Sequence, residues 1–490
     1  METPAYGFMN WRRLSLWLLP PVTCLWIHKR SLLTWYLLDD FQWLAYSMHI
    51  SSVAQFLNVL LTPTVYGTFR PLSERLLFLT FGPLFRENAL PLHILAFITF
   101  FGCLWLLAAF VRRLTGSFWA ALGATLAWTA TMPVTKILGW SSAYMQVLCG
   151  LLLLAALYFL ARYEEHNERR DYRLQWVAFL LCFGVIETAI VYPALACGFS
   201  LLFHRRLPRG ALKMWLVSVA YFAFHSLYAR QKATGPYLMH FDAPSLAHTF
   251  AAYWQMMFAH PSLPLISRWP AAALPWLTGL FTLAVLGWTA IAFRRGNRLP
   301  LFGLVWFVVT LGPILPLREH ISDYYLALPL AGIAMVLCSA LELVRVRPVG
   351  LAFLALYCAL QLPVIEAASR FQRTSGERYK RVILGVAAMR ERDPQRGILL
   401  VGADPFFLGN VMRNNGFWAF GCDRIYLDPA EVKPENPDLH HYMLEPEAIR
   451  REIDRGRLRV ITVAGDKLTD ITATYRSPNG ANRPRQSGAQ

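Results

Sequence analysis

Long apolar runs constrain this chain more than any other feature. About eleven segments are long enough to cross, or nearly cross, a bilayer whose hydrocarbon core needs about 20 helical residues. Lipid offers no hydrogen bonds to the backbone, so such segments become helices. The sequence therefore predicts an α-helical polytopic membrane protein with about eleven transmembrane helices, at residues 13–28, 88–111, 117–133, 141–162, 174–186, 188–204, 211–229, 271–293, 299–316, 323–343 and 348–367.

Composition supports the same class of protein. Hydrophobic residues make up 56% of the chain and charged residues 16%, and the mean hydropathy is +0.37. These values are too apolar for a single soluble core. The net charge of +17 would suggest a nucleic-acid partner in a soluble domain. Here most Lys and Arg lie in short connections between apolar runs, so we expect them to set membrane orientation and expect no nucleic-acid partner.

The basic connections alternate with connections that carry few cations. Basic connections mark the cytoplasmic side of a membrane protein. The N-terminus is basic as well, and the first apolar run lacks a small-residue cleavage site, so it resembles an anchor. We expect a protein of the bacterial inner (plasma) membrane with its N-terminus in the cytoplasm and its C-terminus outside. The basic connections are residues 112–113, 161–173, 204–210, 293–298 and 344–348.

The last 120 residues change character. The runs "GILLVGA", "DRIYLDP" and "LRVITVAG" are typical of short strands, and "GERYKRVILGVAAMRER" and "EPEAIRREIDRG" have helical spacing. This alternation predicts a small soluble α/β module. We therefore expect a membrane domain at 1–367, an extracytoplasmic module at 368–474 and a disordered polar tail at 475–490. A folded cap is favoured over an independent active site.

Two adjacent carboxylates follow the first apolar run, in "TWYLLDDFQWLAY". Asp39 and Asp40 repel each other and bind water strongly, so near a membrane they need a wet cavity, a cation or a chemical task. They are candidate catalytic residues and candidate ligands of a divalent metal ion. On chemistry alone, two aspartates that simply follow a helix end in water fit the pattern equally well.

Further polar residues are expected at the same outer level. Arg and Lys bind phosphate, and a carboxylate removes a proton or holds a cation, so together they would suit an anionic headgroup with a lipid tail. Each cation alone is better explained by snorkelling or topology. The run "PLREHISDYY" also places Glu319 and Asp323 at this level. The joint placement favours a substrate site, with Arg70, Lys136, Glu187, Arg318 and His320 as candidate binding residues.

In order and topology, these segments resemble the GT-C membrane glycosyltransferases. The likeness follows the Asp pair, "FRPLSERLLFLTFGPLFRENALPLHILAFITFF", "KILGWSSAYMQVLCGLLLLAALYFL", "ETAIVYP" and "GPILPLREHISDYYLALPLAGIAM". It covers about residues 10–365. The chain is most similar to the polyprenyl-phosphate-sugar-dependent branch, which includes protein O-mannosyltransferases and aminoarabinose transferases.

The resemblance implies a bundle of helices that catalyses O-glycosylation or a related transfer on the extracytoplasmic face. A sugar would pass with inversion from a polyprenyl-phosphate donor to a protein, lipid or polysaccharide acceptor of the cell envelope. Asp40 or Asp39 would act as the base or hold a divalent metal ion. Where many relatives have an Arg-Tyr pair, this chain has Tyr324 and Tyr325, and Tyr325 joins the candidate substrate-binding residues. The donor phosphate would be bound by Arg70, Lys136, Arg318 and His320.

Two other classes stay open. A transporter or flippase of lipid-linked sugars would also be polytopic, but it should show paired halves, and no such pairing is found. A polysaccharide polymerase or ligase would favour a large late outer loop, and residues 230–270 form only a modest one. The polar residues of that loop are irregularly spaced, so we expect scattered surface side chains rather than a metal site at His240, Asp242, His248 and His260.

Overall fold

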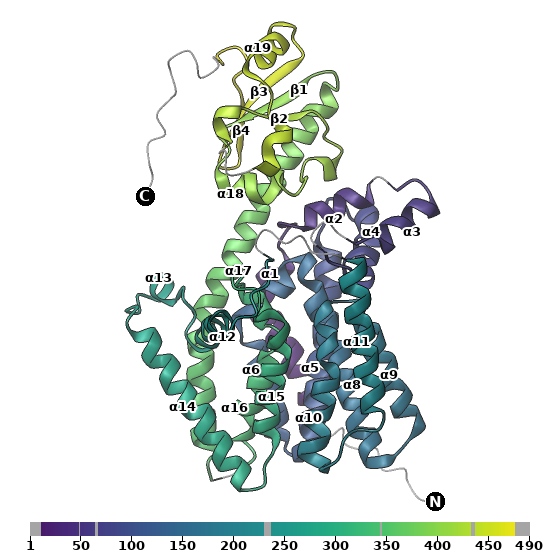
Figure 1. Cartoon of the computed structure of the whole chain (residues 1–490). Helices are drawn as coiled ribbons and strands as arrows, with labels where there is room; N and C mark the ends of the chain where they lie inside the picture. The colour runs from purple at the N-terminus through teal and green to yellow at the C-terminus, as the bar shows by residue number, and fades with distance from the viewer. Residues whose placement is uncertain are drawn as a thin grey trace, which may run out of the picture. The chain divides into compact units, whose positions relative to one another are not determined.

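The computed structural model describes residues 11–48, 50–63, 67–229, 237–343, 345–432 and 437–475 (Figure 1). The chain divides into two compact units. We call Met1–Leu33, Leu57–Leu77 and Leu90–Phe371 the helical unit. We call Thr34–Phe56, Phe78–Ala89 and Gln372–Gln490 the α/β unit. Apart from Tyr475, the predicted disordered tail at 475–490 lies outside the described residues.

The helical unit contains a helix at each predicted apolar run. Among the described residues, five helical segments are long and apolar enough to cross a membrane: Leu90–Thr115, Ser141–His166, Glu187–His204, Ala273–Arg294 and Arg347–Arg392. The total of about eleven spans stays a prediction. The helices at the runs are α1 (Trp11–Leu32), α5 (Leu90–Thr115), α6 (Phe118–Thr129), α8 (Tyr144–His166), α9 (Arg169–Cys182), α10 (Tyr192–His204), α11 (Ala211–Tyr228), α14 (Ala273–Arg294), α15 (Leu299–Leu311), α16 (Leu330–Ser339) and α17 (Arg347–Arg392).

Shorter elements join these helices. Most are single turns or short helices between two longer ones. They are α3 (Val53–Leu61), η1 (Pro71–Arg75), α4 (Leu76–Leu84), α7 (Met132–Gly139), η2 (Ser141–Ala143), η3 (Glu187–Val191), α12 (Ala243–Phe258), α13 (Leu263–Ser267), η4 (Gly312–Ile314) and η5 (Asp323–Leu326).

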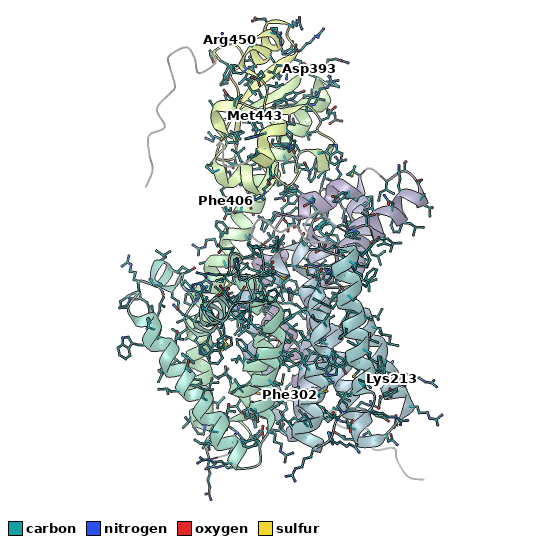
Figure 2. The ribbon with its side chains drawn as sticks, viewed as in Figure 1. Lys213, Phe302, Asp393, Phe406, Met443 and Arg450 are labelled. Atoms are coloured by element: carbon teal, nitrogen blue, oxygen red, sulfur yellow. The ribbon has the colours of Figure 1, made fainter. Side chains whose placement is uncertain are left out.

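Aromatic rings and close backbone contact hold the helical unit together. Phe302 of α15 is fully buried, and its ring centroid lies 5.8 Å from those of both Phe110 and Phe199 (Figure 2). Nearby, α15 and α16 meet at two glycines. A Cβ at Gly303 would lie 2.4 Å from the Gly332 carbonyl oxygen, so only glycine allows this approach.

The predicted basic connections meet at one end of the helical unit. Side-chain contacts link the connection after α5 to that after α8, and the connection after α14 to those after α10 and α16. Orientation relative to the cytoplasm stays a prediction, but shared placement at one end is what the alternation of basic loops requires. The linked pairs are Arg113–Glu165, Arg206–Glu164, Arg298–Leu202 and Asn297–Glu342.

The α/β unit is built on a four-stranded sheet of order β2-β1-β3-β4. Three of its strands coincide with the runs predicted as strands, and β4 forms an additional antiparallel edge. Leu399, Val460 and Leu458 pack against Ile449 of the covering helix. The elements are β1 (Gly397–Val401), β2 (Ile425–Leu427), β3 (Leu458–Ala464), β4 (Lys467–Asp470), α18 (Pro405–Phe407), η6 (Leu408–Met412), η7 (Trp418–Phe420), η8 (Pro429–Glu431), η9 (Pro437–Tyr442) and α19 (Pro446–Asp454).

Two segments from the first quarter of the chain belong to the α/β unit. They are Thr34–Phe56, which contains α2 (Asp40–Ser47), and Phe78–Ala89. Trp35 lies with its ring centroid 5.3 Å from that of Phe420, and Phe41 lies 6.3 Å from Tyr379. The Asp pair is therefore part of the α/β unit.

Candidate functional site

Arg70 lies between two carboxylates in the helical unit. Its Nε and Nη2 atoms lie 2.9 and 2.8 Å from Glu187 Oε2, and its Nη1 atom lies 2.6 Å from Glu74 Oε1. Backbone contacts fix this geometry, because Leu72 N donates to the Gly184 carbonyl at 2.8 Å. The predicted candidates Arg70 and Glu187 are thus in direct contact.

The two carboxylates beside Arg70 differ in their surroundings. Glu74 is buried, and its Oε2 atom has no hydrogen-bond partner among the described residues. Burial raises the pKa of Glu74 above its usual 4.5, and Glu187 raises it further while Arg70 opposes the change. Both carboxylates contact the Arg70 guanidinium. Arg70 is therefore a less available phosphate ligand than the sequence suggests.

A second charged cluster joins α7 to η5. Lys136 Nζ lies 2.8 Å from Asp323 Oδ1, and His260 Nε2 lies 3.8 Å from Asp323 Oδ2. Burial alone would raise the pKa of Asp323, but His260 and Lys136 outweigh it and lower that pKa below 3.8. Asp323 is thus an ionised carboxylate shared by a lysine and a histidine. The prediction that His260 is a surface side chain is wrong, because only 8% of it is exposed.

Aromatic side chains lie beside this second cluster. The Tyr324 and Tyr325 rings are 4.2 Å apart, and His320 lies 4.6 Å from Tyr237 and 5.8 Å from Tyr325. Burial lowers the pKa of His320, so its imidazole is neutral at pH 7 and offers a hydrogen bond rather than a charge.

The same tyrosines connect the two charged clusters. Arg70 Nη1 lies 2.8 Å from Met145 Sδ in the first turn of α8. Trp140 immediately precedes η2, which leads into α8, and its ring centroid lies 5.3 Å from that of Tyr324. The structure therefore brings five of the six predicted binding residues into one region of the helical unit: Arg70, Lys136, Glu187, His320 and Tyr325.

Arg318 is the most accessible of the predicted cations. It is exposed, and its Nη1 atom donates to Ser245 Oγ at 3.2 Å. In the part of the chain that the structure describes, no carboxylate forms an ion pair with Arg318. Its charge is therefore not neutralised as that of Arg70 is.

Asp39 and Asp40 lie in the α/β unit, at the start of α2. Asp40 is fully buried and its Oδ2 atom accepts a hydrogen bond from Leu37 N at 3.0 Å. Asp39 is half-buried. The intervening turn places Leu38 at φ 49°, a left-handed conformation that is unfavourable for leucine. Such strain often accompanies function, because surrounding structure must hold it in place.

The Asp pair alone provides few ligands for a metal ion. Among the described residues no group of three or more His, Cys, Asp or Glu side chains could hold one. The Oδ2 atom of Asp40 is already engaged by the backbone. A divalent cation at Asp39 would therefore take most of its ligands from water or from a substrate phosphate.

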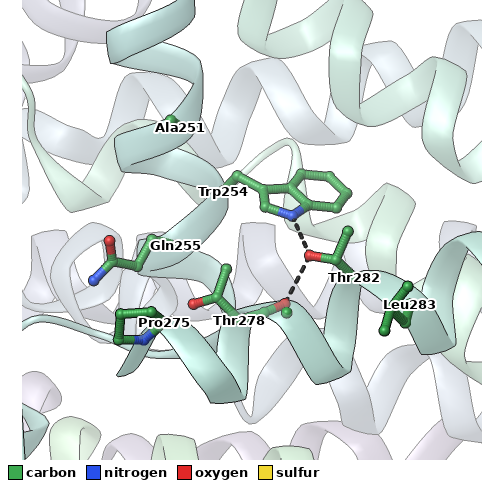
Figure 3. A pocket seen from close by; sticks show the side chains of 8 residues that line it. Ala251, Trp254, Gln255, Pro275, Thr278, Thr282 and Leu283 are labelled. Atoms are coloured by element: carbon green, nitrogen blue, oxygen red, sulfur yellow. Dashed lines mark hydrogen bonds between the residues drawn. The ribbon is translucent and has the colours of Figure 1, made fainter. Parts of the chain in front are cut away.

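A separate apolar cavity of about 500 Å³ lies between α12 and α14 (Figure 3). Trp254 Nε1 donates to Thr282 Oγ1 at 2.7 Å, and Thr282 donates to the Thr278 carbonyl at 2.7 Å. None of the predicted site residues lines this cavity. Helix α12 nevertheless contributes to the charged region, because Ser245 contacts Arg318 and Tyr253 accepts from Ser322 N at 3.1 Å.

Comparison with known proteins gives no family assignment. No protein-family model matches this chain, and no curated protein is detectably similar to it. Functional conclusions therefore depend on the residues themselves.

Sequence reasoning missed several partners in the charged region. Glu74 was detectable as the residue four positions after Arg70, a spacing that places two side chains together on a helical turn. Asp323 was expected at the same level as Lys136, but their pairing has no local signal, because the two residues are distant in sequence. The same is true of His260 and of His225, whose Nε2 atom lies 3.6 Å from Glu187 Oε1.

Proposed function

We propose that this chain is a membrane glycosyltransferase that uses a polyprenyl-phosphate-linked sugar as its donor. The observation that supports this most is the convergence of ionisable residues in one region of a unit otherwise made of apolar helices. Charged groups are costly in such surroundings and are usually retained for a function. Here Lys136 and Asp323 are joined by an ion pair beside Tyr324. The Tyr324 ring lies 5.3 Å from that of Trp140, and Arg70 contacts Met145 one turn further along the same segment.

The donor phosphate would be bound by Lys136 and Arg318. Lys136 has one carboxylate partner and a side chain that is one-third exposed, so it can reach an added oxyanion, and Arg318 is exposed. Both would form charge-assisted hydrogen bonds to phosphate oxygens. His320 and Tyr325 would supply further hydrogen bonds to the sugar phosphate.

The chemistry would be a single displacement. An acceptor hydroxyl or amine attacks the anomeric carbon, the bond from that carbon to the phosphate oxygen breaks, and polyprenyl phosphate leaves. The acceptor proton passes to a carboxylate. The resemblance to GT-C enzymes implies Asp40 or Asp39 for this role, and both residues belong to the α/β unit. One direct displacement inverts the anomeric configuration. The site would face the extracytoplasmic side of a bacterial inner membrane.

A transfer assay tests this proposal. Purified protein would be given short-chain polyprenyl phosphates carrying mannose, glucose, galactose, arabinose or an amino sugar. Peptide, lipid and polysaccharide acceptors of the cell envelope would be supplied with each donor, and products read by mass spectrometry. Transfer of one sugar supports the proposal. Binding of a donor without transfer, together with movement of the lipid across liposomes, would instead indicate a flippase, and extension of a glycan chain would indicate a polymerase.

A further inference from the structure

A polar cavity of about 760 Å³ lies within the α/β unit. Its walls come from the end of α17, from the loop before β2 and from the segment Phe78–Ala89. This volume is in the range of sites that bind small molecules. The residues that line the cavity include Arg86, Arg390, Phe420, Gly421 and Asp423.

Arg86 is held in a fixed orientation at this cavity. Its Nε atom donates to the Ala419 carbonyl at 3.0 Å, and its guanidinium carbon lies 5.4 Å from the centroid of the Phe420 ring. No carboxylate forms an ion pair with Arg86 among the residues that the structure describes. The two Nη groups are thus positioned but not neutralised. A fixed guanidinium of this kind suits bidentate binding of an oxyanion.

Arg390 forms a fixed part of the cavity wall. Its side chain is only 10% exposed. Its Nη2 atom pairs with Asp423, and its Nη1 atom donates to the Pro394 carbonyl at 2.9 Å and to the Arg396 carbonyl at 2.5 Å. Arg390 is therefore neutralised and engaged within the protein, and Arg86 is the cation that a ligand can bind.

Gly421 preserves the space around Arg86. Its φ of 73° is left-handed, and a Cβ at this position would lie 3.1 Å from Arg86 Nη2. A side chain here would be strained and would crowd the guanidinium.

The acidic side chains of the cavity limit the charge of what it can bind. Glu87 and Glu391 are exposed at its rim, whereas Asp423 is already paired with Arg390. The rim carboxylates would repel a polyanion such as a nucleoside triphosphate. A single oxyanion group attached to an uncharged, hydroxyl-bearing body would meet less of that repulsion.

We propose that this cavity binds the oxyanion group of a small acidic saccharide, either a carboxylate or a phosphate monoester, on Arg86. The inference is independent of the glycosyltransferase proposal, because it depends only on the α/β unit. If both proposals are correct, the protein binds an acidic sugar in the α/β unit and the polyprenyl-phosphate sugar in the helical unit.

Calorimetric binding to the full-length protein in a maltoside detergent tests the inference. The probes are glucuronate, glucose 6-phosphate, inorganic phosphate and neutral glucose. We expect glucuronate or glucose 6-phosphate to bind and glucose not to bind. Arg86→Gln should weaken binding by about tenfold or more, since a charge-assisted hydrogen bond is lost. Gly421→Ala should weaken it as well, and Arg86→Lys should fall between wild type and Arg86→Gln.

Arg450→Gln is the matched control. Arg450 is exposed on α19 of the same unit, and its substitution removes the same charge without touching the cavity (Figure 2). This variant should bind every probe as wild type does. A tighter fit for glucuronate than for glucose 6-phosphate would identify the carboxylate as the recognised group, and the reverse would identify the phosphate.

A second measurement needs no variant and so does not depend on folding. Phenylglyoxal modifies accessible arginine side chains, and mass spectrometry locates the modified residues. Bound glucuronate or sugar phosphate should protect Arg86 and leave Arg450 reactive. Equal binding of glucose, equal binding by Arg86→Gln, or no protection of Arg86 at saturating probe would each overturn the inference.

Discussion

Lys136 Nζ and Asp323 Oδ1 lie 2.8 Å apart, although one residue is on α7 and the other begins η5. This contact fixes the start of η5 against α7, within the region that holds most of the predicted binding residues. Asp323 is nearly buried, whereas one-third of the Lys136 side chain is exposed. The pair therefore combines a structural contact with a cation that a ligand can reach.

The first prediction concerns the pH dependence of stability. Burial acts to raise the pKa of Asp323, but His260 and Lys136 lower it below its ordinary value of 3.8. A lowered pKa contributes stability that is complete above about pH 4 to 5 and is lost as the pH falls through the folded-state pKa. The unfolding temperature of wild type relative to Asp323→Asn should therefore be constant near neutral pH and decrease below about pH 4. If the difference in unfolding temperature between wild type and Asp323→Asn stayed constant down to pH 2.5, Asp323 would not be an ionised carboxylate in the folded protein.

The second prediction is that Arg70, unlike Lys136 and Arg318, acts mainly to stabilise the fold. The Arg70–Glu187 ion pair is partly buried, with side chains that are 15% and 28% exposed, so removing one partner leaves the other charge poorly compensated, at a cost of about 1–3 kcal/mol. Arg70→Gln and Glu187→Gln should each destabilise the protein, and the double variant should recover about 1–3 kcal/mol of the summed loss. Denaturant unfolding in detergent measures this coupling.

The exposed pair Arg370–Glu366 serves as the control for that cycle. Its side chains are 70% and 46% exposed, and the residues are four positions apart on α17. Its coupling should be below about 1 kcal/mol. Equal coupling free energies in the two pairs would show that the Arg70–Glu187 pair stabilises the protein no more than an exposed pair does.

The third prediction concerns donor binding. Lys136→Gln and Arg318→Gln should each weaken binding of a short-chain polyprenyl-phosphate sugar by about 1–3 kcal/mol, because each loses a charge-assisted hydrogen bond to a phosphate oxygen. Arg268→Gln, which removes an exposed cation of the same unit, should bind as wild type does. Unchanged affinity in both test variants would exclude these residues from the donor site.

The fourth prediction assigns the carboxylate. Asparagine keeps the shape of aspartate and can still accept the hydrogen bond from Leu37 N, so Asp40→Asn should fold while its turnover falls by about 100-fold or more. Asp39→Asn is the parallel test, since Asp39 is the more exposed of the two. Asp242→Asn, which changes an exposed helix cap on α12, should keep full activity. Full turnover in both Asp39→Asn and Asp40→Asn would exclude the pair.

The fifth prediction is topological. Reporter fusions after Arg113, Arg206 and Arg295 should all report the cytoplasm, because their connections meet at one end of the helical unit. Fusions after Lys136 and Arg318 should report the opposite side. Different locations for Arg113 and Arg206 would contradict the observed contacts between their connections.

The helices could be predicted because one physical requirement determines them. A chain in lipid must satisfy its own backbone, so apolar length alone indicates helix. The strands β1 and β3 were also predictable, since short apolar runs rich in branched side chains between turns favour them. Sequence patterns did not predict β4, whose burial is slight and whose residues are mostly polar.

The charged contacts could be predicted only in part. Residue type and an expected position at the outer face of the membrane predicted Arg70, Lys136 and Glu187 as binding residues. The partners that Arg70 and Lys136 contact across the fold come from distant parts of the chain. Such pairs depend on how helices pack, which hydropathy does not encode.

The stretch "FQWLAYSMHISSVAQFLNVLL" is amphipathic, which predicts a segment lying in the membrane interface. Its first part, α2, buries Phe41 and Leu44, whereas Val53 and Leu57 of α3 are exposed. A location in the membrane interface stays a prediction for α3.

The α/β unit is assembled from three separate stretches, and this sets an order for its synthesis. Thr34–Phe56 and Phe78–Ala89 leave the ribosome first, but their partner residues begin at Gln372. At about 5–20 residues per second, making residues 90–371 takes about 15–60 s, during which Trp35 lacks Phe420 and Phe41 lacks Tyr379. The two early segments must wait in this incomplete state until the last quarter of the chain emerges. A version ending before Gln372 would leave Trp35 and Phe41 permanently without these two aromatic partners.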